Sequence, residues 1–269
     1  MARVRLPGVL LPVAGLLLLA YVALVLLAYW QQRSMIYFPQ ATRLDAAHTD
    51  FSLDRGDATL RGWVLQPGQA RALLYFGGNA EAVQASADAL AGILPGHTLY
   101  LPAYRGYGAS DGHPTEALLF EDAVALYDEV RRRHPHAPID VIGRSLGSGV
   151  ASHLASRRDV DRLVLVTPFD SMAGVARAHY PWLPVDLLMR ERYESWRTLP
   201  RHQGSLLVVR AGADAVVPAA ATDRLLAALP RAPQVLVLGQ AGHDTVSADP
   251  RYGAAIGGFL GADSGPSAP

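Results

Sequence analysis

The sequence predicts an α/β domain with a mostly parallel, eight-stranded sheet flanked by helices, preceded by one N-terminal transmembrane helix. Three observations lead to this prediction. Residues 6–30 carry no charge, short apolar runs then alternate with helical stretches, and the run at residues 139–142 leads directly into a glycine-rich turn and a helix. This alternation is typical of a parallel sheet covered by helices on both faces.

The N-terminal apolar segment is long enough to cross a bilayer. A helix of 25 residues covers a hydrocarbon core of about 30 Å at a rise of 1.5 Å per residue, even if Pro7 and Pro12 shorten it. Tyr29 and Trp30 suit the far interface. A cleaved signal peptide is the alternative, but the apolar region is long and no clear A-x-A site follows it. We expect residues 1–30 to be an uncleaved membrane anchor.

The charges around this segment bear on its orientation. Arg3 and Arg5 precede it, whereas Arg33 and Arg43 follow it. The positive-inside rule then favours a cytoplasmic N-terminus and an exported, periplasmic or extracytoplasmic domain, although Arg33 and Arg43 weaken the bias.

The rest of the chain fits one domain, over residues 31–260. A tail at residues 261–269, rich in Gly, Ser, Ala and Pro, is expected to be disordered. Strands are expected at residues 35–38, 59–65, 72–76, 98–103, 139–142, 163–167, 206–210 and 235–238.

Composition excludes several kinds of chemistry. The chain has no cysteine and no lysine, and its net charge is zero. A cysteine nucleophile, a Ser-Lys dyad, a pyridoxal Schiff base and a Walker lysine are therefore absent, and nucleic acid is not an expected partner. The sequence also contains no metal-binding motif, so we expect no metal and no cofactor.

The glycine-rich turn after residue 142 carries the candidate nucleophile. Gly143, Ser145 and Gly147 form a G-x-S-x-G pentapeptide between the strand at 139–142 and a helix expected at 146–157. In this arrangement the serine hydroxyl is exposed on a strained bend, and small flanking residues let the backbone close up. Ser145 is the predicted nucleophile, and the N–H of Leu146 is a predicted oxyanion donor.

A serine nucleophile needs a base, and with lysine and cysteine absent histidine is the base suited to neutral pH. His243 follows the strand at 235–238, and Asp214 follows the strand at 206–210. Both lie at strand C-terminal ends and in the chain order Ser, Asp, His. Asp214 could instead cap the helix expected at residues 219–229, in which case Asp170 is the rival acid.

Two further segments carry a family resemblance. Tyr75 to Ala80 reads Tyr-Phe-Gly-Gly-Asn-Ala, and Tyr104 to Gly112 reads Tyr-Arg-Gly-Tyr-Gly-Ala-Ser-Asp-Gly. With the serine motif, they resemble the α/β-hydrolases of the membrane-anchored, serine-aminopeptidase-like group that includes α/β-hydrolase-domain proteins acting on lipids and acyl chains. The resemblance runs from about residue 35 to residue 260. It implies an α/β-hydrolase fold and a second oxyanion donor at the N–H of Asn79, although Gly77 stands where the family has histidine.

Residues 170–204 lie where this fold carries its lid. The segment holds many apolar and aromatic side chains, which either cap the core or form a small lid over an acyl pocket facing the bilayer. The residues are Met172, Tyr180, Trp182, Leu183, Leu187, Leu188, Met189, Tyr193 and Trp196.

These observations together predict a membrane-anchored serine hydrolase that cleaves an ester or thioester of an acyl or lipid-type small molecule through Ser145, His243 and Asp214. A serine peptidase is the alternative enzyme, although no acidic cluster is present to bind a substrate amine. A non-catalytic, membrane-anchored binding protein is the alternative of another class. The sequence does not specify the acyl chain, the head group or the oligomeric state.

Overall fold

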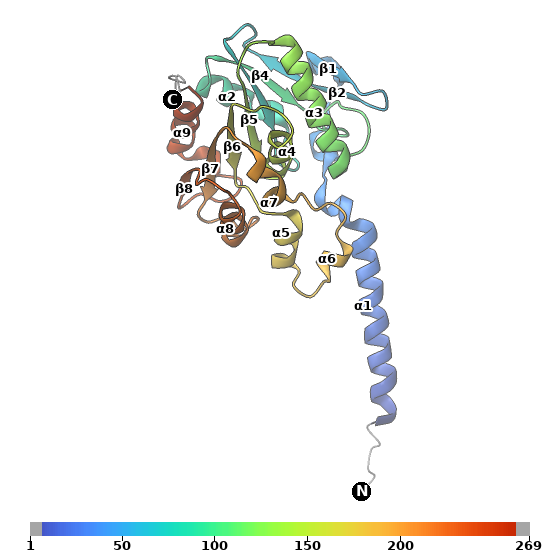
Figure 1. The fold of residues 1–269 in the computed structure, drawn as a ribbon. Coiled ribbons are helices and arrows are strands. Elements are labelled where there is room, and N and C mark those ends of the chain that lie inside the picture. Colours follow the sequence, from blue (N-terminus) through green and yellow to red (C-terminus); the bar gives the residue numbers. More distant parts are fainter. Residues whose placement is uncertain (1–6, 262–269) are drawn as a thin grey trace.

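The fold predicted from the sequence is confirmed. A computed structural model describes residues 7–261; Arg3, Arg5 and the tail after residue 261 lie outside this range. An eight-stranded, mostly parallel sheet carries helices on both faces, and a long N-terminal helix extends away from it (Figure 1).

The sheet has the strand order β1-β2-β4-β3-β5-β6-β7-β8. The first two strands pair antiparallel with each other, and β2 pairs antiparallel with β4; all other neighbours are parallel. The strands are β1 (Phe51–Asp54), β2 (Thr59–Leu65), β3 (Arg71–Phe76), β4 (His97–Pro102), β5 (Ile139–Arg144), β6 (Arg162–Val166), β7 (Ser205–Ala211) and β8 (Gln234–Leu238).

Helices cover the sheet through two apolar cores. Buried residues of α3, α4 and α8 pack in one core cluster, and those of α2 and α9 pack in the other. The helices are α1 (Pro7–Ile36), α2 (Ala87–Ile93), α3 (Glu116–Arg133), α4 (Leu146–Ala155), α5 (Met172–His179), α6 (Val185–Leu188), α7 (Ser195–Thr198), α8 (Ala219–Ala227) and α9 (Pro250–Gly261).

One strand prediction is wrong. Residues 35–38 form no strand, because α1 continues through Ile36 and Tyr37 N–H still donates to the carbonyl of Arg33 at 2.8 Å. The first strand is instead β1, which was not predicted. It pairs with β2 through a tight connection in which Gly56 has a φ of 82°.

The helix α1 is the candidate membrane span. Residues 11–42 contain a window of mean hydropathy 2.6, none of which is buried against the rest of the protein. By length and composition this helix can cross a membrane.

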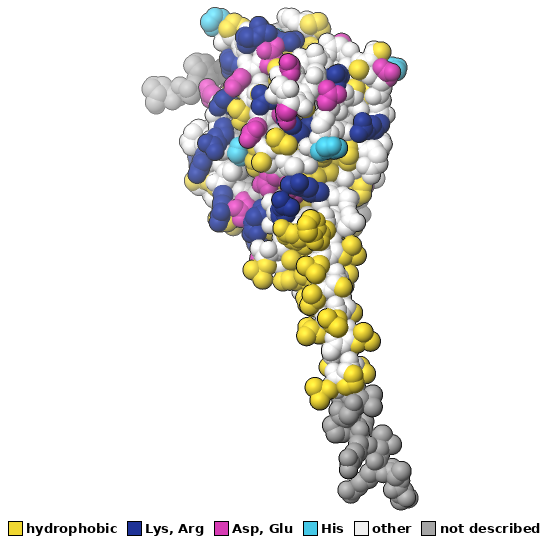
Figure 2. Space-filling model, turned by 90° about the vertical axis from the view of Figure 1, so that its right-hand side faces the viewer, with side chains coloured by type: hydrophobic (Ala, Val, Ile, Leu, Met, Phe, Trp, Pro, Cys, Tyr) yellow, Lys and Arg dark blue, Asp and Glu magenta, His cyan; other side chains and the backbone are white. Residues whose placement is uncertain are grey.

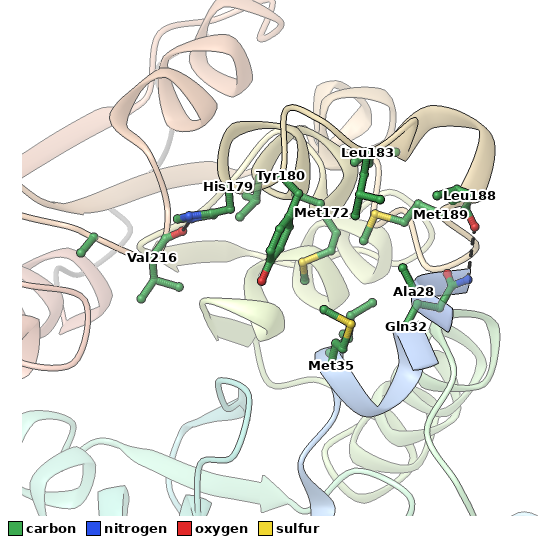
Figure 3. A pocket seen from close by; sticks show the side chains of 15 residues that line it. Ala28, Gln32, Met35, Met172, His179, Tyr180, Leu183, Leu188, Met189 and Val216 are labelled. Carbon is green, nitrogen blue, oxygen red and sulfur yellow. Dashed lines mark hydrogen bonds between the residues drawn. The ribbon is translucent and has the colours of Figure 1, made fainter. Parts of the chain in front are cut away.

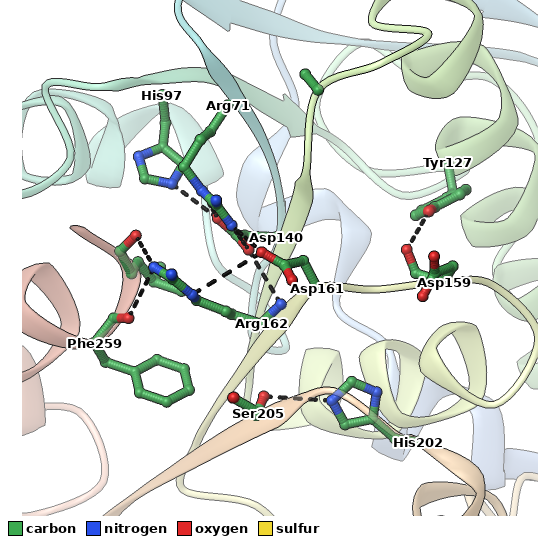
Figure 4. A network of polar contacts seen from close by, with 12 residues as sticks. Arg71, His97, Tyr127, Asp140, Asp159, Asp161, Arg162, His202, Ser205 and Phe259 are labelled. Carbon is green, nitrogen blue, oxygen red and sulfur yellow. Dashed lines mark hydrogen bonds and ion pairs between the residues drawn. The ribbon is translucent and has the colours of Figure 1, made fainter. Parts of the chain in front are cut away.

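A buried polar network ties the strands together at the end of the sheet opposite to the candidate site. Asp140 is fully buried and accepts two hydrogen bonds of 2.8 Å from Arg71 and one of 3.1 Å from the N–H of Arg162 (Figure 4). Its carboxylate also lies 2.9 Å from Nε2 of His97. These four residues lie at the starts of β3, β4, β5 and β6. A buried carboxylate with this many partners holds neighbouring strands in register.

Candidate active site

Ser145 lies on the sharp turn between β5 and α4. Its φ of 51° and ψ of −116° are unusual for a residue other than glycine, and its side chain is partly exposed. The turn is closely packed: a Cβ at Gly147 would lie 2.0 Å from the carbonyl oxygen of Phe76. Such strain at a reactive residue is typical of a nucleophile elbow.

Three side chains meet at the C-terminal edge of the sheet in one hydrogen-bonded chain. The Oγ of Ser145 lies 2.9 Å from Nε2 of His243, and Nδ1 of His243 lies 2.8 Å from Oδ2 of Asp214. The other carboxylate oxygen of Asp214 accepts hydrogen bonds from the N–H groups of Val216 and Val217, at 2.9 and 2.7 Å. The loops after β5, β7 and β8 supply these residues, as the sequence predicts.

Electrostatics favour a charged Asp214. Burial opposes ionisation, but the hydrogen bond from His243 and the N–H groups of Val217 and Val216 outweigh it and lower the pKa of Asp214. An ionised carboxylate accepts the Nδ1–H of His243, which leaves the Nε2 lone pair to accept the Ser145 proton.

Asp170 occupies a different site. Its carboxylate pairs with Arg224 through two hydrogen bonds, of 2.8 and 3.0 Å. Its partner is therefore an arginine of α8, and His243 bonds to Asp214 instead.

The segment after β3 lies against the Ser145 turn. A Cβ on Gly78 would lie 3.5 Å from Cβ of Ser145. Within residues 7–261, the N–H groups of Asn79 and Leu146 donate no hydrogen bond to a protein acceptor. Both N–H groups are therefore free to donate to a ligand.

Two tyrosines of the 104–112 segment hold this loop. The Tyr104 hydroxyl donates to the carbonyl of Gly77, and the Tyr107 hydroxyl donates to Oδ1 of Asn79, each at 2.9 Å. Arg105, between them, turns away and pairs with carboxylates elsewhere. The side chain of Asn79 and the carbonyl of Gly77 are thus fixed, while the N–H of Asn79 stays available to a ligand.

Glu81 is a loop residue that the sequence analysis missed. Its carboxylate accepts hydrogen bonds from the N–H of Gly78 (2.6 Å), the hydroxyls of Tyr75 (2.6 Å) and Ser86 (2.9 Å), and the guanidinium of Arg144 (3.2 Å). The Glu81 side chain, 9% exposed, therefore joins the loop at residues 77–80 to Arg144, which precedes Ser145.

Position 77 is closely packed in this arrangement. A Cβ at position 77 would lie 2.6 Å from Val83 Cγ1 and 3.3 Å from the carboxyl group of Glu81. A histidine at position 77 would therefore collide with the Val83 side chain and crowd the Glu81 carboxyl group, and glycine avoids both contacts.

The 170–204 segment forms α5, α6 and α7, and a cavity of about 400 Å³ lies between α5, α6 and the end of α1 (Figure 3). Five of the apolar residues singled out in the sequence line it: Met172, Tyr180, Leu183, Leu188 and Met189. The others differ, since Tyr193 is buried in the core whereas Trp182, Leu187 and Trp196 are exposed. The sequence did not predict that α1 contributes Ala28, Gln32, Met35 and Ile36 to the cavity wall.

No group of three or more His, Asp or Glu side chains placed to hold a metal ion occurs in the part of the chain that the structure describes.

Comparisons with known proteins agree with the fold. A family model described as the alpha/beta hydrolase fold matches residues 71–198. Uncharacterized protein Rv2307c of Mycobacterium tuberculosis is 34% identical over 249 residues, which cover 87% of this chain and 88% of that protein. Lysophosphatidylserine lipase ABHD12 of Danio rerio is 30% identical over 133 residues, or 43% of this chain and 35% of the lipase.

Solved structures share the fold at low sequence identity. The Pyrococcus furiosus esterase Pf2001 superposes with a TM-score of 0.65 at 19% identity, over 79% of this chain and 91% of the esterase. The enol-lactonase from Burkholderia xenovorans superposes with a TM-score of 0.60 at 13% identity, over 79% of this chain and all of the lactonase.

Proposed function

The chain belongs to the α/β-hydrolase superfamily, whose fold supports hydrolase activity, and we propose that it is a membrane-anchored serine hydrolase of acyl or lipid-type esters or thioesters. The observation that carries this proposal is the hydrogen-bonded chain from Ser145 through His243 to Asp214. The likeness to a lysophosphatidylserine lipase supports a lipid-type substrate, although the match covers 35% of that lipase.

The reaction begins with attack of the Ser145 oxygen on the carbonyl carbon while His243 Nε2 takes the hydroxyl proton. The N–H groups of Asn79 and Leu146 donate to the oxyanion of the tetrahedral intermediate, each contributing roughly 3–4 kcal/mol. Asp214 stabilises the imidazolium and keeps the ring in its orientation.

Collapse of the intermediate breaks the carbonyl carbon's bond to the alcohol or thiol, which leaves with the proton from His243. Water then attacks the acyl-Ser145 ester as His243 takes a proton from it. The acid is released, and Ser145 regains its proton.

The test replaces Ser145 and His243 singly and together. Ser145→Ala should abolish hydrolysis of a p-nitrophenyl ester and labelling by a fluorophosphonate without unfolding the protein. His243→Ala should be about equally inactive, and the double variant little worse, because members of a triad act as a unit. Fully additive losses would place the two residues in separate sites. A panel of acyl esters and aminoacyl amides then distinguishes an esterase from a peptidase.

We also propose that α1 anchors the domain on the exported side of the membrane. The full chain should resist extraction by high salt and alkaline carbonate, because α1 is apolar over a bilayer's thickness. Proteinase added to intact spheroplasts should digest the domain if Arg3 and Arg5 set the orientation. Protection from the proteinase would place the domain in the cytoplasm.

A further inference from the structure

The segment that includes α5 and α6 is fastened to α1 at two levels. The Tyr21 hydroxyl donates to the carbonyl of Trp182 at 3.0 Å. Eleven residues farther along α1, Gln32 Nε2 donates to the carbonyl of Leu188 at 3.2 Å, and its Oε1 accepts from the N–H of Arg190 at 2.7 Å. The segment therefore lies alongside the apolar helix (Figure 1).

The lower contact lies within the membrane-spanning part of α1. A hydrocarbon core of about 30 Å takes about 20 residues of an upright helix. Any 20-residue window inside the uncharged residues 6–30 ends between residues 25 and 30. Tyr21 then lies roughly 6–13 Å below that boundary at 1.5 Å per residue. A bilayer that surrounds α1 at the level of Tyr21 must therefore also contact Trp182.

The tip of the segment suits hydrocarbon. Residues 180–185, Tyr-Pro-Trp-Leu-Pro-Val, carry no charge, and Trp182 and Leu187 have exposed fractions of 51% and 87%. Backbone groups without partners are costly in lipid. Here Pro181 and Pro184 have no N–H, and α1 side chains satisfy the carbonyls of Trp182 and Leu188.

The charged groups of the segment that lie closest to hydrocarbon are paired. Asp186, between Val185 and Leu187, pairs with Arg177, and nearer the domain Arg33 of α1 pairs with Glu191 at 2.7 Å. Pairing lowers the cost of a charge near the bilayer, and long arginine side chains can direct their charge toward the head groups. Arginines lie close to apolar side chains where α1 joins the domain (Figure 2).

The cavity between α1 and this segment extends to the loop that follows Asp214. Apolar side chains of both elements line it, and Ala215 and Val216, which directly follow Asp214, line it as well. The His179 ring contacts the carbonyl of Val216 at 2.8 Å (Figure 3). The cavity's volume of about 400 Å³ is within the range of small-molecule sites.

We propose that the α5–α6 segment is embedded in the bilayer beside α1, and that the cavity between them binds the acyl chain of a lipid that remains in the membrane. The membrane helix is then a wall of the substrate site as well as an anchor. The link to catalysis rests on the proposed acyl-hydrolase function, whereas insertion and chain binding do not.

Fluorescence tests the insertion directly. The chain has no cysteine, so Leu187→Cys can be labelled at one position with an environment-sensitive dye in the full chain, reconstituted in phosphatidylcholine vesicles. Val237→Cys is the matched control, because Val237 is an exposed aliphatic residue (51%) on β8. The dye at position 187 should be blue-shifted and quenched by doxyl-labelled lipid, unlike the dye at 237. Equal responses at the two positions would overturn the insertion.

Photocrosslinking tests the occupant. Full-length protein carrying Ser145→Ala is reconstituted with phosphatidylcholine bearing a diazirine in its acyl chain, and the labelled peptides are identified. Ala176→Phe, which fills the cavity from α5, should reduce labelling of cavity residues about tenfold, equivalent to a 1.4 kcal/mol loss of binding. Ala178→Phe, on α5 but outside the cavity wall, should leave labelling unchanged. Equal labelling of the two variants would overturn chain binding.

These outcomes separate the two proposals. Labelling that persists in a protein without activity toward any ester would refute the hydrolase and leave the lipid site standing. An active enzyme whose cavity is never labelled would refute the lipid site and leave the hydrolase standing.

Discussion

Replacement of Glu81 should impair catalysis by loosening the loop at residues 77–80, which carries the proposed oxyanion donor Asn79. In Glu81→Ala the N–H of Gly78 loses its acceptor, which costs about 1–3 kcal/mol for a buried group. Arg144, whose side chain is 18% exposed, also loses its nearer carboxylate partner and keeps only a contact of 3.8 Å with the exposed Asp244. Asn79, one residue beyond Gly78, is then held only through the bonds of Tyr104 to the Gly77 carbonyl and of Tyr107 to its own side chain, so the position of its N–H is less well defined. Because complete loss of one oxyanion donor costs about 10²–10³ in kcat, we expect a fall on the order of 10².

Glu81→Gln tests whether catalysis depends on the hydrogen bond from Gly78 to residue 81 or on the negative charge of Glu81. The amide oxygen can still accept from Gly78, while its NH₂ group faces the hydroxyls of Tyr75 and Ser86, which can turn to accept. Only the charge opposite Arg144 is lost, so kcat should stay within about tenfold of wild type, because the preorganised donor remains.

The assay is steady-state hydrolysis of a p-nitrophenyl ester, with the free energy of unfolding measured in urea. Asp170→Ala is the matched control, because Asp170 is another carboxylate, 8% exposed, that pairs with an arginine. It should lose stability without a comparable fall in kcat. The reasoning is refuted if folded Glu81→Ala keeps the wild-type kcat, or if Asp170→Ala loses as much activity.

Three further outcomes follow from the structure. Asp214→Asn should lower kcat on the order of 10⁴ through the wrong imidazole tautomer, whereas Asp170→Asn should cost far less; the reverse ranking in ester hydrolysis would transfer the role to Asp170. Gly147→Ala should destabilise the domain and abolish activity, since its Cβ would lie 2.0 Å from a carbonyl oxygen; an unchanged urea midpoint would contradict this. Burial, reinforced by nearby arginines, lowers the pKa of His153 to about 4. Between about pH 6.5 and 4 the unfolded chain therefore binds a proton that the folded chain does not, so the free energy of unfolding decreases as the pH falls. His153→Phe, which can still stack on Phe120, should remove up to about 3 kcal/mol of this loss, less because solvent screens the partly exposed ring; parallel urea-stability profiles for the two proteins would refute this.

The sequence predicted the parallel part of the sheet because its strands are continuous apolar runs. Strands β5 and β6 are almost entirely buried, so both faces of each strand required apolar residues. The antiparallel edge gave a weaker signal, since β1 is only four residues long and reads Phe-Ser-Leu-Asp. Residues 35–38 are apolar enough to resemble a strand, but periodicity does not separate so short a run from the end of a helix.

The candidate site likewise has residues that the sequence could predict and residues that it could not. Ser145, Asp214 and His243 were predictable because each follows a strand in an order that the fold repeats. Glu81 was not, because its role depends on four donors brought together from separate segments. The contribution of α1 to the cavity was equally hidden, since it depends on how an apolar helix packs against a segment about 150 residues away in the chain.

Glu191 joins the end of α1 to the rest of the protein through hydrogen bonds. Its buried carboxylate accepts hydrogen bonds from Arg33 at 2.7 Å, from the Tyr37 hydroxyl at 3.0 Å and from the N–H of Glu116 at 2.5 Å. It thereby joins the end of α1 to the segment that follows α6 and to the first turn of α3. Removal of one member of a buried charged network leaves the others without partners, so these elements are held together as a unit. A displacement of α1 would therefore move the elements joined at Glu191 and change the cavity wall, which Gln32, Met35 and Ile36 of α1 form in part.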